Sequence, residues 1–302
     1  MASPSDVTDN LPSVAGVTHR WVSVGSLTVH VACAEPQGGA VDRVPVVLVH
    51  GWPQHWWCWR QVIGPLSRDR AVYAVDLRGH GWTTTPPAGY DKFTLADDLA
   101  ETIKTMGLEQ IDLVGHDWGG WISLLAAAEH PELVRRVVAV AIPAPWWRPS
   151  RTLNPALVYL YLAGGRAGVF LHRRLKQIFL RIVLRVSRAD RLHRRPKSEV
   201  EPYLERFRHP ARAHAGMELY RTFVTQELGP YTYGRYSPKM PEQPVLLLPA
   251  QHDPVNKPSQ VAKAVASGAN IECQVIPDSG HMVPEEQPEE LIRRVRGFLD
   301  RP

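Results

Sequence analysis

The chain has 302 residues, of which 44% are hydrophobic and 22% are charged, a balance typical of a globular protein. This length allows one large domain or two modest ones, and the composition excludes a disordered or collagen-like chain. The longest apolar run, residues 137–147, is interrupted by Pro143 and Pro145, and no run reaches the ~18 residues that a membrane span requires. The first residues lack the basic start and apolar stretch of a secretion signal, so we expect a soluble, cytoplasmic protein.

The three cysteines, Cys33, Cys58 and Cys273, are scattered along the chain without a CxxC pair. An odd, scattered set predicts neither a disulfide framework nor a cysteine-based zinc site, and it fits a reducing compartment.

The net charge of +5 conceals an uneven distribution. Residues 146–239 contain 19 of the 35 Lys and Arg residues and 6 of the 30 Asp and Glu residues, so this segment carries +13 and the rest −8. We interpret the segment as a solvated, Arg-rich helical face, with steering of acidic ligands or contact with anionic surfaces as the alternative. No nucleic-acid-binding motif accompanies the charge, so we expect no nucleic-acid partner.

The first half of the chain alternates strands and helices. Residues 17–23 and 27–34 predict a hairpin with its turn near Gly25. Further strands are expected at 44–49, 71–75, 111–115 and 134–141, and helices at 56–68, at 94–106 with Thr94 as the N-cap, and at 118–130. This rhythm indicates an α/β protein with a mostly parallel sheet and helices on both faces.

The alternation stops at residue 146 and resumes after residue 239. Between these points the sequence shows helical periodicity at 155–163, 169–186 and 211–228 and no strand-like run. A strand at 245–249, a helix at 256–267, a strand at 271–276 and a helix at 286–300 follow. We therefore expect one core made of residues 1–145 and 240–302, with 146–239 inserted as a helical lid.

The strongest motif lies where the strand at 111–115 meets the next helix, and it reads Gly115-His116-Asp117-Trp118-Gly119-Gly120. This is a G-x-S-x-G elbow with aspartate in place of the nucleophilic serine. A sharp strand-to-helix turn requires small flanking residues, and it puts the central side chain at a helix N-terminus that favours an anion. A simple N-cap would explain Asp117 but not the glycines on both sides.

Two further motifs follow predicted strands. His50-Gly51-Trp52-Pro53 comes directly after the strand at 44–49, where the Trp52 N–H can join that of Trp118 in an oxyanion hole. Ser279-Gly280-His281 follows the last strand, where His281 can reach the carboxyl edge of a parallel sheet.

An acidic residue that orients His281 is expected after one of the preceding strands. Asp253 follows the strand at 245–249, whereas the loop after the strand at 134–141 contains no acidic residue. Asp278 lies only three residues before His281, where it is better placed to brace the loop. Asp253 is therefore the candidate, and the chain order of nucleophile, acid and histidine supports it.

The motifs HGWP, DLRGHGW, GHDWGG, QHDP and SGH together resemble the α/β-hydrolase superfamily, and more narrowly the epoxide hydrolases with an aspartate nucleophile. The resemblance extends from about Val17 to Asp300. It implies an α/β-hydrolase fold in which Asp117 is the nucleophile and His281 with Asp253 activates water. Haloalkane dehalogenases share the aspartate, the tryptophan after it and the histidine, so they are the alternative family.

The resemblance also implies two lid tyrosines that donate a proton to the epoxide oxygen. Tyr220, in the sequence Leu219-Tyr220-Arg221-Thr222, is similar to the second of these. For the first we favour Tyr161 over Tyr159. We expect His50, Pro53, Trp146 and Tyr159 to line an apolar substrate pocket.

The expected reaction converts a small hydrophobic epoxide and water into a vicinal diol. Asp117 attacks an epoxide carbon to form an alkyl ester, which water activated by His281 and Asp253 hydrolyses. No metal or organic cofactor is required. A ligand-binding protein on a hydrolase fold is the alternative of another class, and a homodimer is left open.

Overall fold

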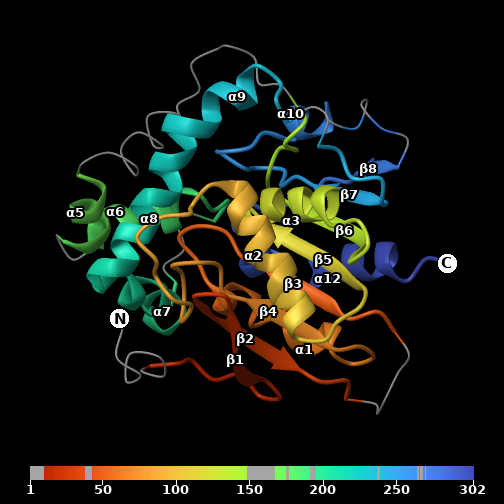
Figure 1. The fold of residues 1–302 in the computed structure, drawn as a ribbon, viewed down its shortest axis with the longest axis horizontal. Helices are drawn as coiled ribbons and strands as arrows, with labels where there is room; N and C mark the ends of the chain where they lie inside the picture. Colours follow the sequence, from red (N-terminus) through yellow and green to blue (C-terminus); the bar gives the residue numbers. More distant parts are fainter. Residues whose placement is uncertain are drawn as a thin grey trace.

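The computed structural model describes residues 10–37, 43–147, 167–174, 177–190, 195–236, 239–263, 265, 268 and 270–302. Within these ranges eight strands form one sheet in the order β1-β2-β4-β3-β5-β6-β7-β8 (Figure 1). The strands are β1 (Thr18–Val24), β2 (Leu27–Ala34), β3 (Val46–Val49), β4 (Val72–Val75), β5 (Ile111–His116), β6 (Val134–Val140), β7 (Val245–Leu248) and β8 (Ile271–Cys273).

The sheet is mostly parallel, as the sequence predicts. β2 pairs antiparallel with β1 and β4, and the pairs from β4 through β8 are all parallel. Parallel strands end at the same edge of a sheet, so the loops after β3, β5, β6 and β7 meet there. β3 and β7 are apolar and buried along their whole length, which is typical of a strand covered on both faces.

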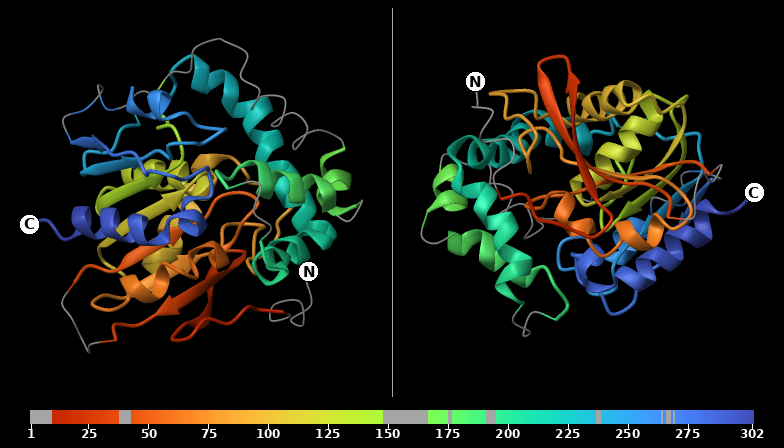
Figure 2. Two further views of the ribbon diagram at one scale, coloured as in Figure 1. Left: turned by 180° about the vertical axis from the view of Figure 1, so that it is seen from behind. Right: turned by 90° about the horizontal axis from the view of Figure 1, so that it is seen from below.

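Helices cover both faces of the sheet. α2 (Lys92–Thr105) and α3 (Trp118–Glu129) lie on one face, and α1 (Ile63–Leu66) and α12 (Pro288–Leu299) lie on the other (Figure 2). The short elements η2 (Trp56–Trp59), α10 (Pro258–Ala262) and α11 (Val283–Glu286) complete the core. No helix among the described residues is long and apolar enough to cross a membrane.

Several predicted helix boundaries in the core differ from the structure. Helix 94–106 begins at Lys92, because Asp91 rather than Thr94 is its N-cap and accepts the Thr94 N–H at 2.9 Å. The stretch 56–68 contains the 3₁₀ turn η2 and the one-turn helix α1 instead of one helix. α10 is shorter than the predicted 256–267.

A helical region is inserted between β6 and β7, and it lies at one end of the sheet (Figure 1). Its described elements, called the helical insert below, are α5 (Gly168–Arg173), α6 (Ile178–Val186), α7 (Lys197–Arg208), α8 (Pro210–Thr222), the π-helix η4 (Phe223–Glu227) and α9 (Leu228–Thr232).

Sequence periodicity predicts the helical insert only in part. The expected helix 169–186 is broken at Gln177, whose φ of +56° is left-handed. α7 was not predicted, because Pro202 and its many charges obscure the apolar face formed by Tyr203, Leu204 and Phe207. The predicted helix 155–163 lies outside the described residues.

The basic segment is not simply a solvated face. Arg206 Nε donates to the Gly81 carbonyl at 3.0 Å, and buried Arg212 donates to the Thr83 carbonyl at 3.1 Å. Arg195 forms a two-bond ion pair with the buried carboxylate of Glu285. These arginines attach the helical insert to the core, which periodicity and net charge could not indicate.

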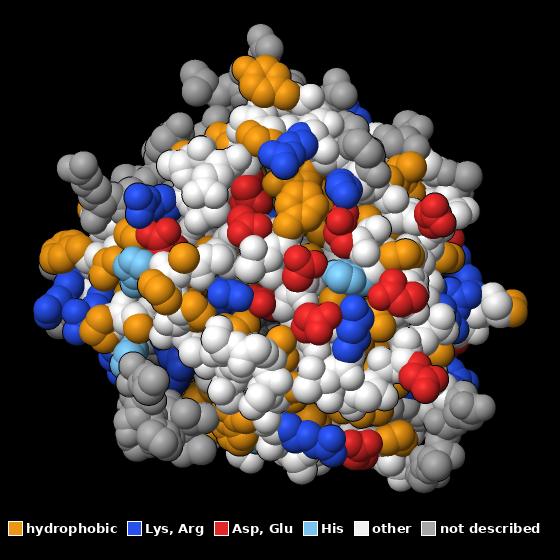
Figure 3. Space-filling view, in the orientation of Figure 1, with side chains coloured by type: hydrophobic (Ala, Val, Ile, Leu, Met, Phe, Trp, Pro, Cys, Tyr) orange, Lys and Arg blue, Asp and Glu red, His pale blue; other side chains and the backbone are white. Residues whose placement is uncertain are grey.

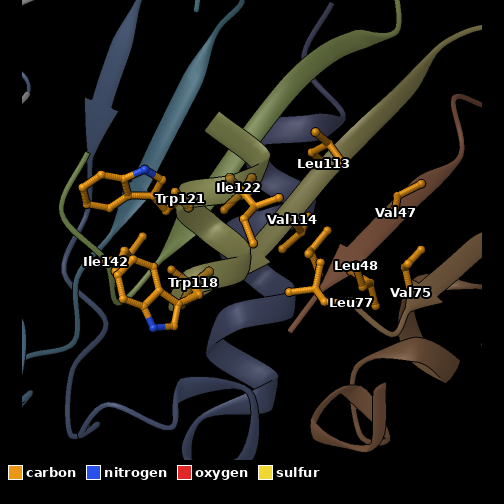
Figure 4. Packing of buried hydrophobic residues seen from close by; sticks show 14 of the residues in the cluster. Val47, Leu48, Val75, Leu77, Leu113, Val114, Trp118, Trp121, Ile122 and Ile142 are labelled. Atoms are coloured by element: carbon orange, nitrogen blue, oxygen red, sulfur yellow. The ribbon is translucent and has the colours of Figure 1, made fainter. Parts of the chain in front are cut away.

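The hydrophobic core extends from the middle of the sheet to the base of the helical insert. Figure 4 shows Leu48 of β3 and Val114 of β5 beside Ile122 of α3, with Trp118 and Trp121 toward the start of the same helix. Trp118 and Trp121 are both buried, and Trp121 is among the largest fully buried side chains. The helix that carries the elbow is thus fixed by packing along its length.

Candidate active site

Asp117 occupies the turn between β5 and α3. Its backbone has φ 51° and ψ −128°, a combination that non-glycine residues rarely adopt and that functional sites can hold under strain. The Asp117 side chain caps no N–H group of α3. This arrangement contradicts the simple N-cap interpretation and presents a carboxylate at the carboxyl edge of the sheet.

Glycines permit the close approaches that this turn requires. A Cβ atom on Gly115 would lie 2.3 Å from the Gly119 carbonyl oxygen, and one on Gly119 would lie 2.2 Å from the Val49 carbonyl oxygen. A Cβ atom on Gly51 would lie 2.4 Å from Cβ of Asp117. A larger residue at any of the three positions would therefore displace the backbone around the carboxylate.

His281 lies between two aspartates. Its Nδ1 donates to Asp253 Oδ2 at 2.9 Å, and its Nε2 is 3.4 Å from Asp117 Oδ1. Asp253 is fixed in turn, because its Oδ1 accepts the N–H groups of Val255 at 2.7 Å and Asn256 at 3.0 Å. The structure thus brings together the three residues that the sequence singled out, whereas exposed Asp278 helps to hold the loop through its backbone.

Burial and charge set the protonation of this group. Burial lowers the pKa of His281, but the carboxylates of Asp253 and Asp117 outweigh it and hold the pKa well above its ordinary value of 6.5. Burial raises the pKa of Asp117, but the hydrogen bond and charge of His281 outweigh it and hold the pKa below 3.8. These opposite shifts favour a carboxylate on Asp117 paired with an imidazolium on His281.

The loop after β3, which contains Trp52, places a backbone donor at the Asp117 carboxylate. The Trp52 N–H donates to Asp117 Oδ2 at 3.0 Å. Trp118 begins α3, so its N–H is one of the four at a helix start that have no intrahelical acceptor. Asp117 Oδ2 therefore faces the Trp52 N–H, and Oδ1 lies on the side of His281.

Two predicted pocket residues lie beside this loop. His50 is fully buried, and its ring joins two backbone groups: Nδ1 donates to the Gly51 carbonyl at 2.9 Å and Nε2 accepts the Leu77 N–H at 3.0 Å. His50 therefore braces the loop through both ring nitrogens, and its place in the substrate pocket stays a prediction. Pro53 follows Trp52 across a cis peptide bond and is buried.

Tyr220 lies over the site from α8. Its ring centroid is 4.9 Å from that of Trp52 and 6.0 Å from that of Trp118, and the residue is buried. Trp146 is buried in the loop after β6, at the same edge of the sheet. Tyr159 and Tyr161 lie outside the described residues, so their roles stay predictions.

A buried ion pair beside Trp118 was not predicted from the sequence. The Lys92 ammonium is 2.9 Å from Glu227 Oε2, 3.2 Å from the Leu219 carbonyl oxygen and 4.6 Å from the centre of the Trp118 ring. Lys92 thereby attaches α2 to the turn of α8 that carries Tyr220. The partners are far apart in sequence, so the only available signal was a lysine next to an apolar residue in the first turn of α2.

Asp76, in the DLRGHGW motif, also has a positioning role. Its carboxylate accepts the N–H groups of Trp56 at 2.7 Å and Trp82 at 3.0 Å and the Nδ1–H of His30 at 2.7 Å. It thus fixes η2, which follows the Trp52 loop. Within the described ranges, no group of three or more His, Cys, Asp or Glu side chains is arranged to hold a metal ion.

Comparison with known proteins places this geometry in a family. A family model for the alpha/beta hydrolase fold matches residues 44–288. The chain is 36% identical over 121 residues to the soluble epoxide hydrolase of Corynebacterium sp. (strain C12), a match that covers 40% of each chain. It is 27% identical over 283 residues to the 2-(acetamidomethylene)succinate hydrolase of Mesorhizobium japonicum, covering 93% of this chain and 95% of that one. The structure of the ligand-free epoxide hydrolase CorEH is similar in fold, with a TM-score of 0.79, 24% identity, and coverage of 94% of this chain and 99% of that one. The family match covers well over half of the chain, which therefore belongs to the α/β-hydrolase family.

Proposed function

We propose that this protein is an epoxide hydrolase that converts a small apolar epoxide into a vicinal diol through an ester on Asp117. The observation that carries the proposal is a carboxylate, instead of a hydroxyl, at the elbow, 3.4 Å from a histidine that a second aspartate orients. A serine that displaces at an sp³ carbon forms an ether, which a histidine-activated water does not cleave. A carboxylate forms an ester, which such a water does cleave. The similarity to the Corynebacterium epoxide hydrolase supports the same activity.

In the first step Asp117 Oδ1 attacks an epoxide carbon, and the bond from that carbon to the ring oxygen breaks. The ring oxygen takes a proton from Tyr220, with Tyr161 as the proposed second donor. The product is an alkyl ester on Asp117. Oδ2, already next to the Trp52 N–H, becomes its carbonyl oxygen.

Once the ester has neutralised Asp117, His281 releases its proton to solvent. In the second step its Nε2 takes a proton from water, and the hydroxide attacks the carboxyl carbon of Asp117. The N–H groups of Trp52 and Trp118 hold the oxyanion, and each such donor contributes about 3 kcal/mol in comparable sites. When the intermediate collapses, the leaving oxygen takes the proton from His281 and the diol departs. The proton left on the Asp117 carboxyl restores the tyrosine through solvent.

We further propose that residues 146–239 act as the lid of this site. Tyr220 approaches Trp52 and Trp118 from α8, so the helical insert supplies the acid while the core supplies the nucleophile and base. Water enters only the second step, and a covering element excludes it from the first.

The proposal predicts that the ester accumulates when the base is removed. In His281→Gln, Asp117 can still attack the epoxide, but the ester that forms is not hydrolysed. After incubation with styrene oxide, the peptide containing Asp117 therefore gains the mass of one substrate. His214→Gln, at a half-exposed position on α8, is the control and turns over without an adduct. Mass spectrometry of the digested protein measures both.

Absence of the adduct in His281→Gln would contradict the ester route. Incubation of the native protein with a bromoalkane is the companion assay, since release of bromide without any diol from epoxides would establish the dehalogenase alternative.

A further inference from the structure

His281 is held by its backbone as well as by its ring. Its N–H donates to the Ser187 carbonyl at 2.6 Å, and its carbonyl accepts Nε2–H of His116 at 2.7 Å. Ser187 follows α6, so the helical insert directly contacts the main chain of the proposed base. His116 belongs to the elbow, which adds a contact from the core.

Glu286 joins the two chain segments that meet at this point. Its Oε2 accepts the N–H groups of Ala189, at 2.8 Å, and of Gly280, at 3.0 Å. Its Oε1 accepts the Met282 N–H at 3.0 Å. One carboxylate thus binds a donor on each side of His281 and a donor in the helical insert, and hydrogen bonds to an ionised acceptor are the stronger kind.

The two backbones are in close contact there. A Cβ atom on Gly280 would lie 2.4 Å from the Ala189 nitrogen and 2.6 Å from the Arg188 carbonyl carbon. The His281 loop therefore cannot shift toward the helical insert, and the hydrogen bonds of Glu286 oppose a shift away from it.

We propose that Glu286 is a positioning residue that couples the helical insert to the base, aligning His281 with the attacking water only while residues 187–189 are seated on its loop. The inference rests on the proposed two-step function. Attack by Asp117 does not use the imidazole as a base, whereas ester hydrolysis does. Loss of the Glu286 contacts therefore slows the second step selectively.

The kinetic test compares Glu286→Gln with Glu289→Gln. Glutamine keeps the shape but offers one acceptor oxygen, so it cannot bind all three N–H groups. Glu289 is exposed three residues later and is the matched control. In a single turnover with styrene oxide, quenched at intervals and digested, Glu286→Gln forms the Asp117 ester within about twofold of the native rate and hydrolyses it at least about tenfold more slowly.

Gly280→Ala keeps Glu286 and tests the coupling independently. The added methyl group separates the two backbones, so the same selective loss of ester hydrolysis is expected. The proposal is overturned if Glu286→Gln leaves both steps unchanged, or if it slows both equally, as a general loss of stability would.

Hydrogen exchange separates failure of this inference from failure of the proposed function. In Glu286→Gln, amide exchange accelerates together in peptides covering 187–189 and 279–283, and in Glu289→Gln it accelerates in neither. Unchanged exchange overturns the coupling whatever the substrate is. Accelerated exchange without any ester in His281→Gln would retain the coupling and reject the epoxide reaction.

Discussion

At the residue scale, the site places two acidic side chains around one histidine. Two carboxylates, Asp117 and Asp253, lie within contact distance of His281, which raises its pKa well above the ordinary 6.5. An imidazolium cannot act as a base. In the proposed reaction, formation of the ester on Asp117 removes one of the two negative charges, so the pKa of His281 falls at the stage when the imidazole must accept a proton.

The variant Asp117→Asn reproduces this loss of charge without a substrate. Because the Asp117 carboxylate raises the pKa of His281, its replacement by a neutral amide lowers that pKa. NMR titration of the imidazole nitrogens in the native protein and in the variant measures the difference. An equal or higher pKa in Asp117→Asn would show that the charge of Asp117 does not control the base.

A second prediction concerns the proposed acid. Tyr220→Phe removes a proton donor for the ring oxygen but leaves the packing against Trp52 intact, so ester formation slows by roughly a hundredfold while ester hydrolysis is unaffected. Tyr233→Phe, at a tyrosine that is 77% exposed, is the control with native rates. Rapid-quench kinetics separates the two steps. A native rate of ester formation in Tyr220→Phe would assign the acid role to another group.

The sequence was most informative for these residues, because the elbow, the Trp52 loop and the His281 loop each follow a strand of one parallel sheet. Strand order and motif position were enough to select Asp253 over Asp278. The bracing role of His50 was not predicted, because the Leu77 N–H that occupies its Nε2 comes from another loop. The role of Glu286 was not predicted either, because an acidic residue in a polar stretch carries no local signal of the backbone groups it binds.

At the element scale, a buried charged cluster joins the helical insert to two segments of the core: the one that follows Trp52 and the one that follows His281. Glu285 of α11 accepts hydrogen bonds from Arg60, Arg195, Tyr203 and Gln54, and its side chain is fully buried. Burial raises the pKa of Glu285, but the guanidinium groups outweigh it and lower the pKa from 4.5 to about 2. Removal of one partner from such a cluster leaves buried charges unpaired.

This cluster makes a prediction about stability and its pH dependence. A pKa depressed from 4.5 to about 2 corresponds to about 3 kcal/mol of folding free energy, present above pH 4.5 and lost as the pH falls through 2. Glu285→Gln therefore lowers the free energy of unfolding at pH 7 by about that amount, and its deficit shrinks toward pH 2. Urea denaturation at several pH values measures it, with Glu289→Gln as the control. A deficit that does not depend on pH would contradict the electrostatic origin.

At the scale of the whole molecule, the core is predictable from sequence and the helical insert much less so. The hairpin and the β-α alternation follow from periodicities of two and 3.6 residues, which hold where each element buries one continuous face. In the helical insert, α7 and η4 depend on contacts with the core that periodicity does not contain. The charges of the helical insert are equally hard to interpret from sequence, because several of its arginines bind carbonyls or carboxylates of the core. Acidic and basic side chains are interspersed at the centre of the face shown in Figure 3.

The same division applies to function. The core supplies Asp117, His281 and Asp253, and it determines the type of chemistry that the site supports. In the proposed reaction, substrate choice belongs to the region where Tyr220 from the helical insert faces Trp52 and Trp118 from the core. The match over residues 44–288 identifies the family, and the reaction is tested at the carboxylate of Asp117.

The most direct measurement is a single turnover in ¹⁸O-water with enzyme in excess over an aryl epoxide, followed by mass spectrometry of both the diol and the digested protein. If Asp117 forms the ester, the new oxygen of the diol comes from its carboxylate. The first diol is then unlabelled and ¹⁸O is retained in the peptide containing Asp117. Label in the first diol, with none in that peptide, would mean direct attack by water and would contradict the proposed mechanism.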